Sequence, residues 1–281
     1  MPTFDTPDPI KATIDVVAGD VRIDAGERAV TTISVEPADA GDAEDRRAAE
    51  QTRVEYADGR LLVKQPKLRS WLPRSTGGAI NVAVELPAGS DVRGDAAMAD
   101  FTSQGPLAEV RLKTGFGRIS VAEAGTLSLR NGIGDISVDR AARHADVTSG
   151  SGEVRVRELA DSAVIRNSNG DTWVGAAHGD LRVRAANGNI AIDVAHASVA
   201  AKSANGDVRL GDAARGSAVL ESKLGDVEIG IREGTAAWLD VRASAGRVHN
   251  ALEAAEAPGE SADTVEVRAR TVAGDVVIRR P

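Results

Sequence analysis

Gly170-Asp-Thr-Trp-Val174 is one copy of a five-residue motif that decides how this chain folds. The motif begins with glycine, continues with an acidic or polar residue, and then alternates apolar and variable residues. Seven copies follow one another in register, and their glycines are Gly117, Gly134, Gly152, Gly170, Gly188, Gly206 and Gly225. These glycines are 17 to 19 residues apart, and looser copies begin at Gly19, Gly59, Gly246 and Gly274. A fixed period of this length indicates a repeat architecture.

The alternation of apolar residues predicts two short strands in each repeat. Counted from the repeat glycine, the second and fourth residues are apolar in nearly every copy, and a second alternation falls at the eleventh and thirteenth. A period of two is that of a β-strand with one buried face. The seventh position holds small residues such as Ala177 and Ala195, which suit a corner between the strands. The repeat glycines are therefore structural, because they supply the positive φ angles of tight turns.

A strand–turn–strand unit of this length cannot bury its own apolar face, so neighbouring units must stack about 4.8 Å apart. The predicted fold is an all-β, single-stranded β-solenoid, a β-helix or β-roll, with coils of about 18 residues. A right-handed coil is favoured, since the six-residue sub-period of the left-handed hexapeptide helix is not evident. A β-propeller is disfavoured because its blades need about 40 residues or more.

The chain divides into an irregular beginning and a regular remainder. Residues 1–90 are expected to form irregular strands, a short helix at Ala43–Gln51 and a cap that is continuous with the solenoid. Residues 91–281 are expected to form the regular solenoid, with a polar insertion at 251–263. The last segment, Thr264–Arg280, is expected to close the stack, because arginine and proline at its end discourage edge pairing.

Composition and charge exclude several classes of site and partner. The chain has no cysteine, so disulfides and thiolate metal sites are ruled out. Its formal net charge of −8 argues against a nucleic-acid partner. The first residues carry no apolar run of signal-peptide length, and no window approaches the roughly 18 apolar residues of a spanning helix. We therefore expect a cytoplasmic location and no membrane span.

No catalytic motif is visible, so neither enzyme activity nor a cofactor is expected. The histidines have neither HExxH nor His-x-His spacing, and the chain contains no P-loop and no nucleophile elbow. His178 and His196 hold the same repeat position one coil apart, which offers two metal ligands at most. The acidic residues after the repeat glycines lack the doubled glycine spacing of calcium-binding β-rolls. Their side chains are better explained as partners of turn amides.

Two outward-facing features are candidates for an interaction surface. A cation column stands four residues before the repeat glycine and comprises Lys113, Arg130, Arg166, Arg184 and Lys202. Stacked coils would align these side chains as a stripe for an anionic glycan, although pairing with nearby acids is the more ordinary explanation. Trp173 stands three residues after its glycine, where it should face outward. An exposed tryptophan is typical of an interface, unless a neighbouring segment covers it.

The repeats resemble the DUF4097 family of β-strand-repeat proteins, whose members are often labelled adhesins. The segments Asn167–Trp173, Trp238–Arg242 and Gly246–Asn250 are similar to its actinobacterial members in particular. The resemblance covers nearly the whole chain and implies a β-solenoid, with no established activity and no catalytic residues. We expect a non-enzymatic structural or protein-interaction scaffold that binds an unknown protein or a second copy of itself. The alternative is the binding, or less readily the cleavage, of an acidic polysaccharide on one face of a β-helix.

Overall fold

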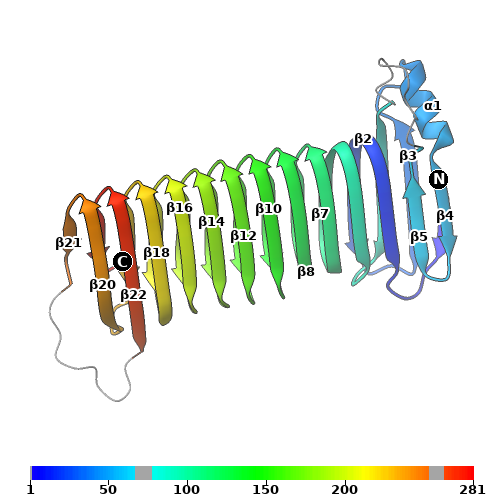
Figure 1. Ribbon diagram of the computed structural model, residues 1–281. Helices are drawn as coiled ribbons and strands as arrows, with labels where there is room; N and C mark the ends of the chain where they lie inside the picture. Colours follow the sequence, from blue (N-terminus) through cyan, green and yellow to red (C-terminus); the bar gives the residue numbers. More distant parts are fainter. Residues whose placement is uncertain (1, 67–77, 253–262) are drawn as a thin grey trace. The chain divides into compact units, whose positions relative to one another are not determined.

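The computed structural model describes residues 2–66, 78–252 and 263–281 (Figure 1). Nearly all regular structure in these ranges is β-strand, and successive coils pair through parallel strands. The predicted β-solenoid is therefore confirmed. Two compact units are distinguished, Met1–Asp139 and Arg140–Pro281. The predicted polar insertion at 251–263 lies largely outside the described residues.

The first unit is organised around one long strand, β2 (Lys11–Gly26). Along one edge, β2 pairs in parallel with β7 (Asp91–Phe116), which in turn pairs with β8 (Ile119–Ile133). Along the other edge, β2 pairs in parallel with β5 (Arg60–Lys64) and then with β6 (Ile80–Pro87). The alternating residues of β2 are buried on one face, as the period of two requires.

Antiparallel strands finish the far side of this unit. β3 (Val30–Pro37) pairs antiparallel with β6 and with the short strand β1 (Thr3–Asp5), and β4 (Arg53–Ala57) pairs antiparallel with β5. The rings of Phe4 on β1 and Tyr56 on β4 lie 5.1 Å apart between centroids. These two short outer strands therefore contact each other through their side chains.

The helix α1 (Ala43–Gln51) forms at the residues where it was predicted. It begins at Asp42, whose carboxylate accepts hydrogen bonds from the amides of Glu44 and Asp45. The Asp45 carboxylate also accepts from the amide of Ala79 at 2.7 Å, just before β6. This hydrogen bond fixes the helix against the strands that finish the first unit.

The second unit stacks two columns of parallel strands (Figure 1). One column contains β10 (Ala145–Ser151), β12 (Ala163–Asn169), β14 (Leu181–Asn187), β16 (Val199–Asn205) and β18 (Gly216–Leu224). The other contains β11 (Val154–Leu159), β13 (Thr172–Ala177), β15 (Ile190–Ala195), β17 (Val208–Ala213) and β19 (Val227–Ile231). Each strand pairs with its counterpart in the next coil, and β9 (Ile136–Ala141) contains the division between the two units.

The core of the second unit consists of the inward columns that the repeat predicted. The second and fourth positions are buried in β11, β13, β15, β17 and β19, as Ile190 and Ile192 show with 1 % exposure each. The small corner residues, including Ala177 and Ala195, are buried as well. Val, Ile, Leu and Ala therefore fill a thin core, in which every side chain packs on its counterpart one coil away.

The repeat glycines and the residues after them join one coil to the next. Gly206 has a φ of +141°, and a Cβ atom there would lie 2.2 Å from the carbonyl oxygen of Gly188. The residue after the glycine reaches along the stack, so that Oδ1 of Asp171 accepts from the amide of Asn189 at 2.8 Å. The same bond joins Asn189 to Asp207. Turn-amide bonding is confirmed for this column, although the amide belongs to the neighbouring coil.

The end of the chain does not close the stack, so this part of the prediction is wrong. β22 (Thr264–Ala273) pairs with β18 on one side and with β20 (Ala236–Ala245) on the other. β23 (Val276–Arg279) lies in the same way between β19 and β21 (Val248–Asn250). Figure 1 shows β22 in red between β18 and β20. The prediction failed because it assumed that coils stack in the order in which they occur along the chain.

Candidate functional site

Trp173 lies half-buried on the outer face of β13, where it was predicted to face outward. Its Nε1–H donates to Oδ1 of Asp193 at 3.3 Å. The guanidinium group of Arg155, opposite in register on β11, lies 5.9 Å from the centroid of the indole ring. Side chains of two adjacent coils therefore hold this tryptophan, and part of its surface remains open to a partner.

The predicted cation column is divided between the two units. Lys113 and Arg130 are opposite each other in register on β7 and β8 of the first unit. Arg166, Arg184 and Lys202 are consecutive in register on β12, β14 and β16 of the second unit. All five side chains are exposed. The structure thus brings the column together within each unit as a pair and as a triplet.

Acidic residues neutralise the two outer members of the triplet. Arg166 Nη1 lies 3.3 Å from a carboxylate oxygen of Asp146, and Lys202 Nζ lies 2.8 Å from Oε2 of Glu221. Arg184 stands between them and has no ion pair or hydrogen bond from its side chain to any other described residue. Arg184 is consequently the cation of the triplet with a guanidinium group available to an anion.

In the first unit the same column is partly neutralised as well. Lys113 Nζ lies 3.8 Å from Oδ2 of Asp95. Arg130 has no ion pair within the parts of the chain that the structure describes. Three of the five cations therefore pair with acids, which is the behaviour of an ordinary solvated surface.

The coil formed by β20 and β21, here called the open coil, is the last coil of the second unit in space. Among the described strands, β20 pairs only with β22, and β21 pairs only with β23. Leu239, Val241 and Ala243 continue the buried columns of β22, yet each is only half-buried because no further coil within the described residues covers it. The open coil therefore presents uncovered apolar side chains and an unpaired strand edge.

Two large side chains add apolar surface to the open coil. Trp238 is 60 % exposed and Val248 is 48 % exposed. Trp238 borders an open hollow of about 980 Å³ that is also lined by Arg215, Asp263 and Glu266. A surface with an exposed tryptophan beside charged groups is more typical of a protein interface than of a solvated strand edge.

Charged side chains cluster on the outer face of the open coil. Oδ2 of Asp240 accepts from Arg270 Nη2 at 2.9 Å, and Arg242 Nε lies 3.6 Å from Oδ1 of the same carboxylate. The hydrogen bond from Arg270, together with the charges of Arg242 and Arg268, lowers the pKa of the Asp240 carboxyl below its usual value. Asp240 is therefore ionised, while the Arg242 side chain is 74 % exposed.

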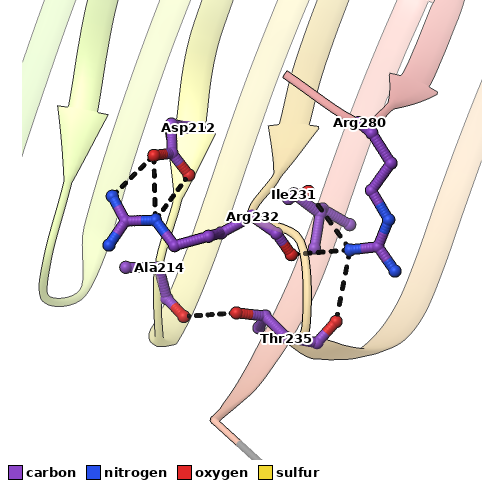
Figure 2. A network of polar contacts seen from close by, with 6 residues as sticks. All are labelled: Asp212, Ala214, Ile231, Arg232, Thr235 and Arg280. Carbon is purple, nitrogen blue, oxygen red and sulfur yellow. Dashed lines mark hydrogen bonds and ion pairs between the residues drawn. The ribbon is translucent and has the colours of Figure 1, made fainter.

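The turn from β19 to β20 is held by the end of the chain, as Figure 2 shows. Nη1 of Arg280 donates to the backbone carbonyls of Ile231, Arg232 and Thr235 at 3.2, 2.6 and 3.3 Å. The hydroxyl of Thr235 donates in turn to the carbonyl of Ala214 at 2.9 Å. The place of the open coil in the stack thus depends on an arginine that is the second-to-last residue.

An ion pair and two stacked histidines lie at the corners of the neighbouring coils. Nε and Nη2 of Arg232 donate to Oδ2 of Asp212 at 2.9 and 2.5 Å, and Nε also donates to Oδ1 at 3.2 Å. This hydrogen bonding raises the pKa of Arg232. The rings of His178 and His196 are parallel to within 1°, with centroids 4.8 Å apart. Partial burial, followed by the charges of His178 and Arg232, lowers the pKa of His196. The predicted proximity of the two histidines is confirmed.

Sequence reasoning missed the open coil and a column of inward polar side chains. This column stands three residues before the repeat glycine, and its side chains donate to the carbonyl of a glycine in an adjacent coil. It includes Asn131, Asn167, Ser203, Ser222 and Thr271. The regular recurrence of Asn, Ser and Thr at one position was a visible signal. For the open coil the signal was Arg247, which follows the repeat glycine Gly246. Most of the other repeat glycines are followed by an acid or an amide instead.

The described residues contain neither a cluster of metal ligands nor a membrane-spanning helix. Across 2–66, 78–252 and 263–281, no group of three or more His, Cys, Asp or Glu side chains is arranged to hold a metal ion. The same ranges contain no helix with the length and apolar character needed to cross a bilayer.

The fold and its surfaces define a β-solenoid protein with an unfinished terminal coil. A sequence model described as Toastrack DUF4097 matches residues 11–279. This chain therefore belongs to the DUF4097 family, as its repeats predicted.

Several solved structures are similar to this chain in fold. One is a protein of Bacteroides fragilis NCTC 9343, named a "putative adhesin", with 10 % identity, coverage of 99 % of this chain and 95 % of that chain, and a TM-score of 0.36. Another, from Parabacteroides distasonis ATCC 8503, is named a "putative lipid binding protein", with 10 % identity, coverage of 100 % and 95 %, and a TM-score of 0.46. No relative with a curated description matches the sequence.

Proposed function

We propose that this chain is a non-enzymatic structural or protein-interaction scaffold that associates through its open coil. The observation that supports it most is the half-covered core at Leu239, Val241 and Ala243, next to the exposed Trp238. Neighbouring coils bury these columns elsewhere in the second unit, so a partner that covers them removes apolar surface from water. The cytoplasmic location and the actinobacterial type, the latter expected in part from Asn167–Trp173, belong to the same proposal.

Light scattering of the full chain over a concentration series tests the scaffold proposal. We expect the mean mass to rise with concentration, or a stoichiometric complex with a protein partner. Trp238→Ala should weaken the association, because it removes the largest exposed apolar side chain of the open coil. Trp173→Ala is the matched control, since Asp193 and Arg155 already engage that ring.

Two outcomes of this experiment would change the location of the interface or contradict the scaffold proposal. Weakening by Trp173→Ala alone would move the interface to the predicted Trp173 face and leave the scaffold in place. A chain that stays monomeric and retains no protein partner contradicts the proposal.

A second candidate function is the binding of an acidic polysaccharide to the cation column. The observation that favours it is Arg184, which has no acidic partner among the described residues and lies between two further cations. Because exposed positive groups attract polyanions, the triplet offers a short binding stripe. Within the described part of the chain, no arrangement of residues supports the cleavage of such a polymer.

Retention on an anionic glycan resin tests this second candidate. The double variant Arg166→Glu with Arg184→Glu should elute at clearly lower salt than the wild type. The matched control is Arg155→Glu with Arg209→Glu, which makes the same change in net charge in the other strand column. Equal elution of the two double variants, or no retention of the wild type, contradicts glycan binding by the column.

A further inference from the structure

We propose that the partner of the open coil is a second copy of this chain, bound by antiparallel pairing of the two β20 strands. The two-fold axis would pass between the two copies of Val241. This inference rests on the scaffold proposal and identifies its partner. Its basis is the self-complementary pattern of Trp238–Ser244, together with the direction of the unpaired backbone groups.

The backbone of β20 has a row of hydrogen-bonding groups directed away from its stack. The amide of Ala236 donates to the carbonyl of Asp263 at 2.9 Å, on the side of β22. Backbone groups alternate in direction along a strand, so those of Trp238, Asp240 and Arg242 also face β22. The N–H and C=O groups of the intervening residues, which are Ala237, Leu239, Val241 and Ala243, face the open edge.

An antiparallel pair centred on Val241 uses these groups in the required geometry. Val241 of each copy then exchanges two backbone hydrogen bonds with the other, and Leu239 of one copy lies opposite Ala243 of the other. These side chains are the half-buried members of the inward columns. The two apolar cores thereby become continuous across the axis. The partner's β20 then buries the inward side chains of the open coil, as neighbouring strands do for the inner coils.

Charge on the outer face selects the same register. Asp240 of one copy lies opposite Arg242 of the other, and the two-fold axis produces this pair twice. Both pairs fall at positions without cross-strand hydrogen bonds, where opposed Cα atoms are closest, about 4.5 Å apart. A two-fold axis at Asp240 or at Arg242 would instead oppose like charges, which is destabilising. Oδ2 of Asp240 is hydrogen-bonded to Arg270 within the chain, so a partner's Arg242, whose side chain is 74 % exposed, would bind Oδ1 of this ionised carboxylate.

The bonds between coils disfavour a copy that would continue the stack in parallel. Inside the stack, Oδ1 of Asp226 accepts from the amide of Asp275, and Oδ1 of Asp275 accepts from the amide of Arg247. Arg247 has no oxygen in its side chain, so it cannot accept from the amide of a following coil. Parallel addition would lack the bond that joins the inner coils, whereas antiparallel pairing of β20 does not require it.

Charge reversal in separate chains tests the pairing. Sedimentation equilibrium or light scattering is run on the full chain between about 1 µM and about 1 mM, a range that covers weak and moderate dimers. In a dimer of the Asp240→Arg variant, arginines would face each other at both of these paired positions. In a dimer of the Arg242→Asp variant, aspartates would face each other there. Each single variant should raise the dissociation constant of the dimer about tenfold or more, since two attractive pairs become repulsive.

Mixing the two single variants provides the decisive measurement. A chain with Asp240→Arg and a chain with Arg242→Asp restore both opposite-charge pairs, so the mixture should form a one-to-one heterodimer near wild-type affinity. Rescue by mixing also shows that each variant is folded. Val241→Pro is an independent variant, because it removes an amide that the monomer leaves unpaired at the edge. It should abolish dimerisation with little change in the melting temperature of the monomer.

The outcomes that overturn the inference are distinct from those that overturn the scaffold. If the wild type associates and all three variants associate equally well, the β20 pairing is wrong and another interface supports the scaffold. Single variants that dissociate but fail to combine on mixing contradict the Asp240–Arg242 register. A wild type that is monomeric up to about 1 mM contradicts the pairing, and the scaffold then depends on the retention of a different protein.

Discussion

The first unit and the second unit finish their strand stacks in opposite ways. In the first unit, short antiparallel strands and α1 cover the outer side, and Phe4 contacts Tyr56 between two of those strands. In the second unit, the last coil has a partner on one side only, and Trp238 is 60 % exposed. Solenoid ends are normally capped to prevent association. The first unit thus ends in antiparallel strands and a helix, whereas the second ends in an open edge, on which the proposed assembly depends.

The largest effect is expected from the space available to a repeat glycine inside the stack. Gly206→Ala should lower the free energy of unfolding by about 3 kcal/mol or more, because the added Cβ meets backbone and the φ of +141° is strained for alanine. Gly246→Ala places a Cβ 1.8 Å from the carbonyl oxygen of Gly274, but the open coil can shift outward. It should therefore cost less in urea unfolding. An equal or larger cost at Gly246 would show that the open coil is as rigid as its neighbours.

Truncating one apolar side chain in the outer strands of the first unit and one in the open coil sharpens the comparison directly. Ile33→Ala on β3 should cost about 2–5 kcal/mol, because this residue is fully buried at 0 % exposure. Leu239→Ala on β20 should cost about 1 kcal/mol in the monomer, because its side chain is half-buried. Both costs are measured by denaturant unfolding at a concentration at which the chain is monomeric. Similar costs would mean that the open coil is covered in the monomer.

A smaller effect is expected from the arginine that holds the turn before the open coil. Arg280→Ala should cost about 1–2 kcal/mol, because the carbonyls of Ile231, Arg232 and Thr235 lose a shared donor. Hydrogen exchange should accelerate mainly in β20 and β21. Arg247→Ala is the control, since that side chain is 91 % exposed and should change exchange little. Unchanged protection in the Arg280→Ala variant would contradict this role.

The smallest effect concerns acid sensitivity at the corners of the inner coils. The pKa of His196 is lowered in the folded chain, so the unfolded chain binds its proton more readily. This contribution to stability is present above the ordinary value of 6.5 and is lost as the pH falls below it. The melting temperature should therefore decline between pH 7.5 and 5.5, and His196→Gln should reduce that decline.

His178→Gln provides a second arm for the same measurement. It removes the stacked neighbour whose charge lowers the pKa of His196, so it too should reduce the acid sensitivity. A wild-type melting temperature that does not change over this pH range would contradict the assignment.

The sequence predicted what depends on a local period. The inward columns, the corner alanines, the turn glycines and the helix at Ala43–Gln51 follow from spacing and residue type alone, and each is found where it was expected. The alignment of Arg166, Arg184 and Lys202 followed from the same count. The repeat features were predictable because each coil repeats the same contacts with the next, and the helix was predictable because its residue types favour a helix.

Features that depend on the order of coils in space were not predictable from the period. The columns are alike in every coil, so they do not show that β22 lies between β18 and β20. The open coil and its exposed Trp238 follow from that order and were missed for the same reason. The contacts of Trp173 with Asp193 and Arg155 were also missed, because they depend on side-chain conformation rather than register.

The position of β22 has a consequence for the synthesis of this chain. β20 and β21 leave the ribosome before Thr264–Arg279, yet those later residues must occupy the places beside β18 and β19. Until they arrive, β18 has no native neighbour on that edge, and β20 can pair with it in a register that later has to be given up. The last native coils can form only when the residues up to Arg279 have been made. Interrupted synthesis would therefore leave a chain that lacks the open coil and any assembly that depends on it.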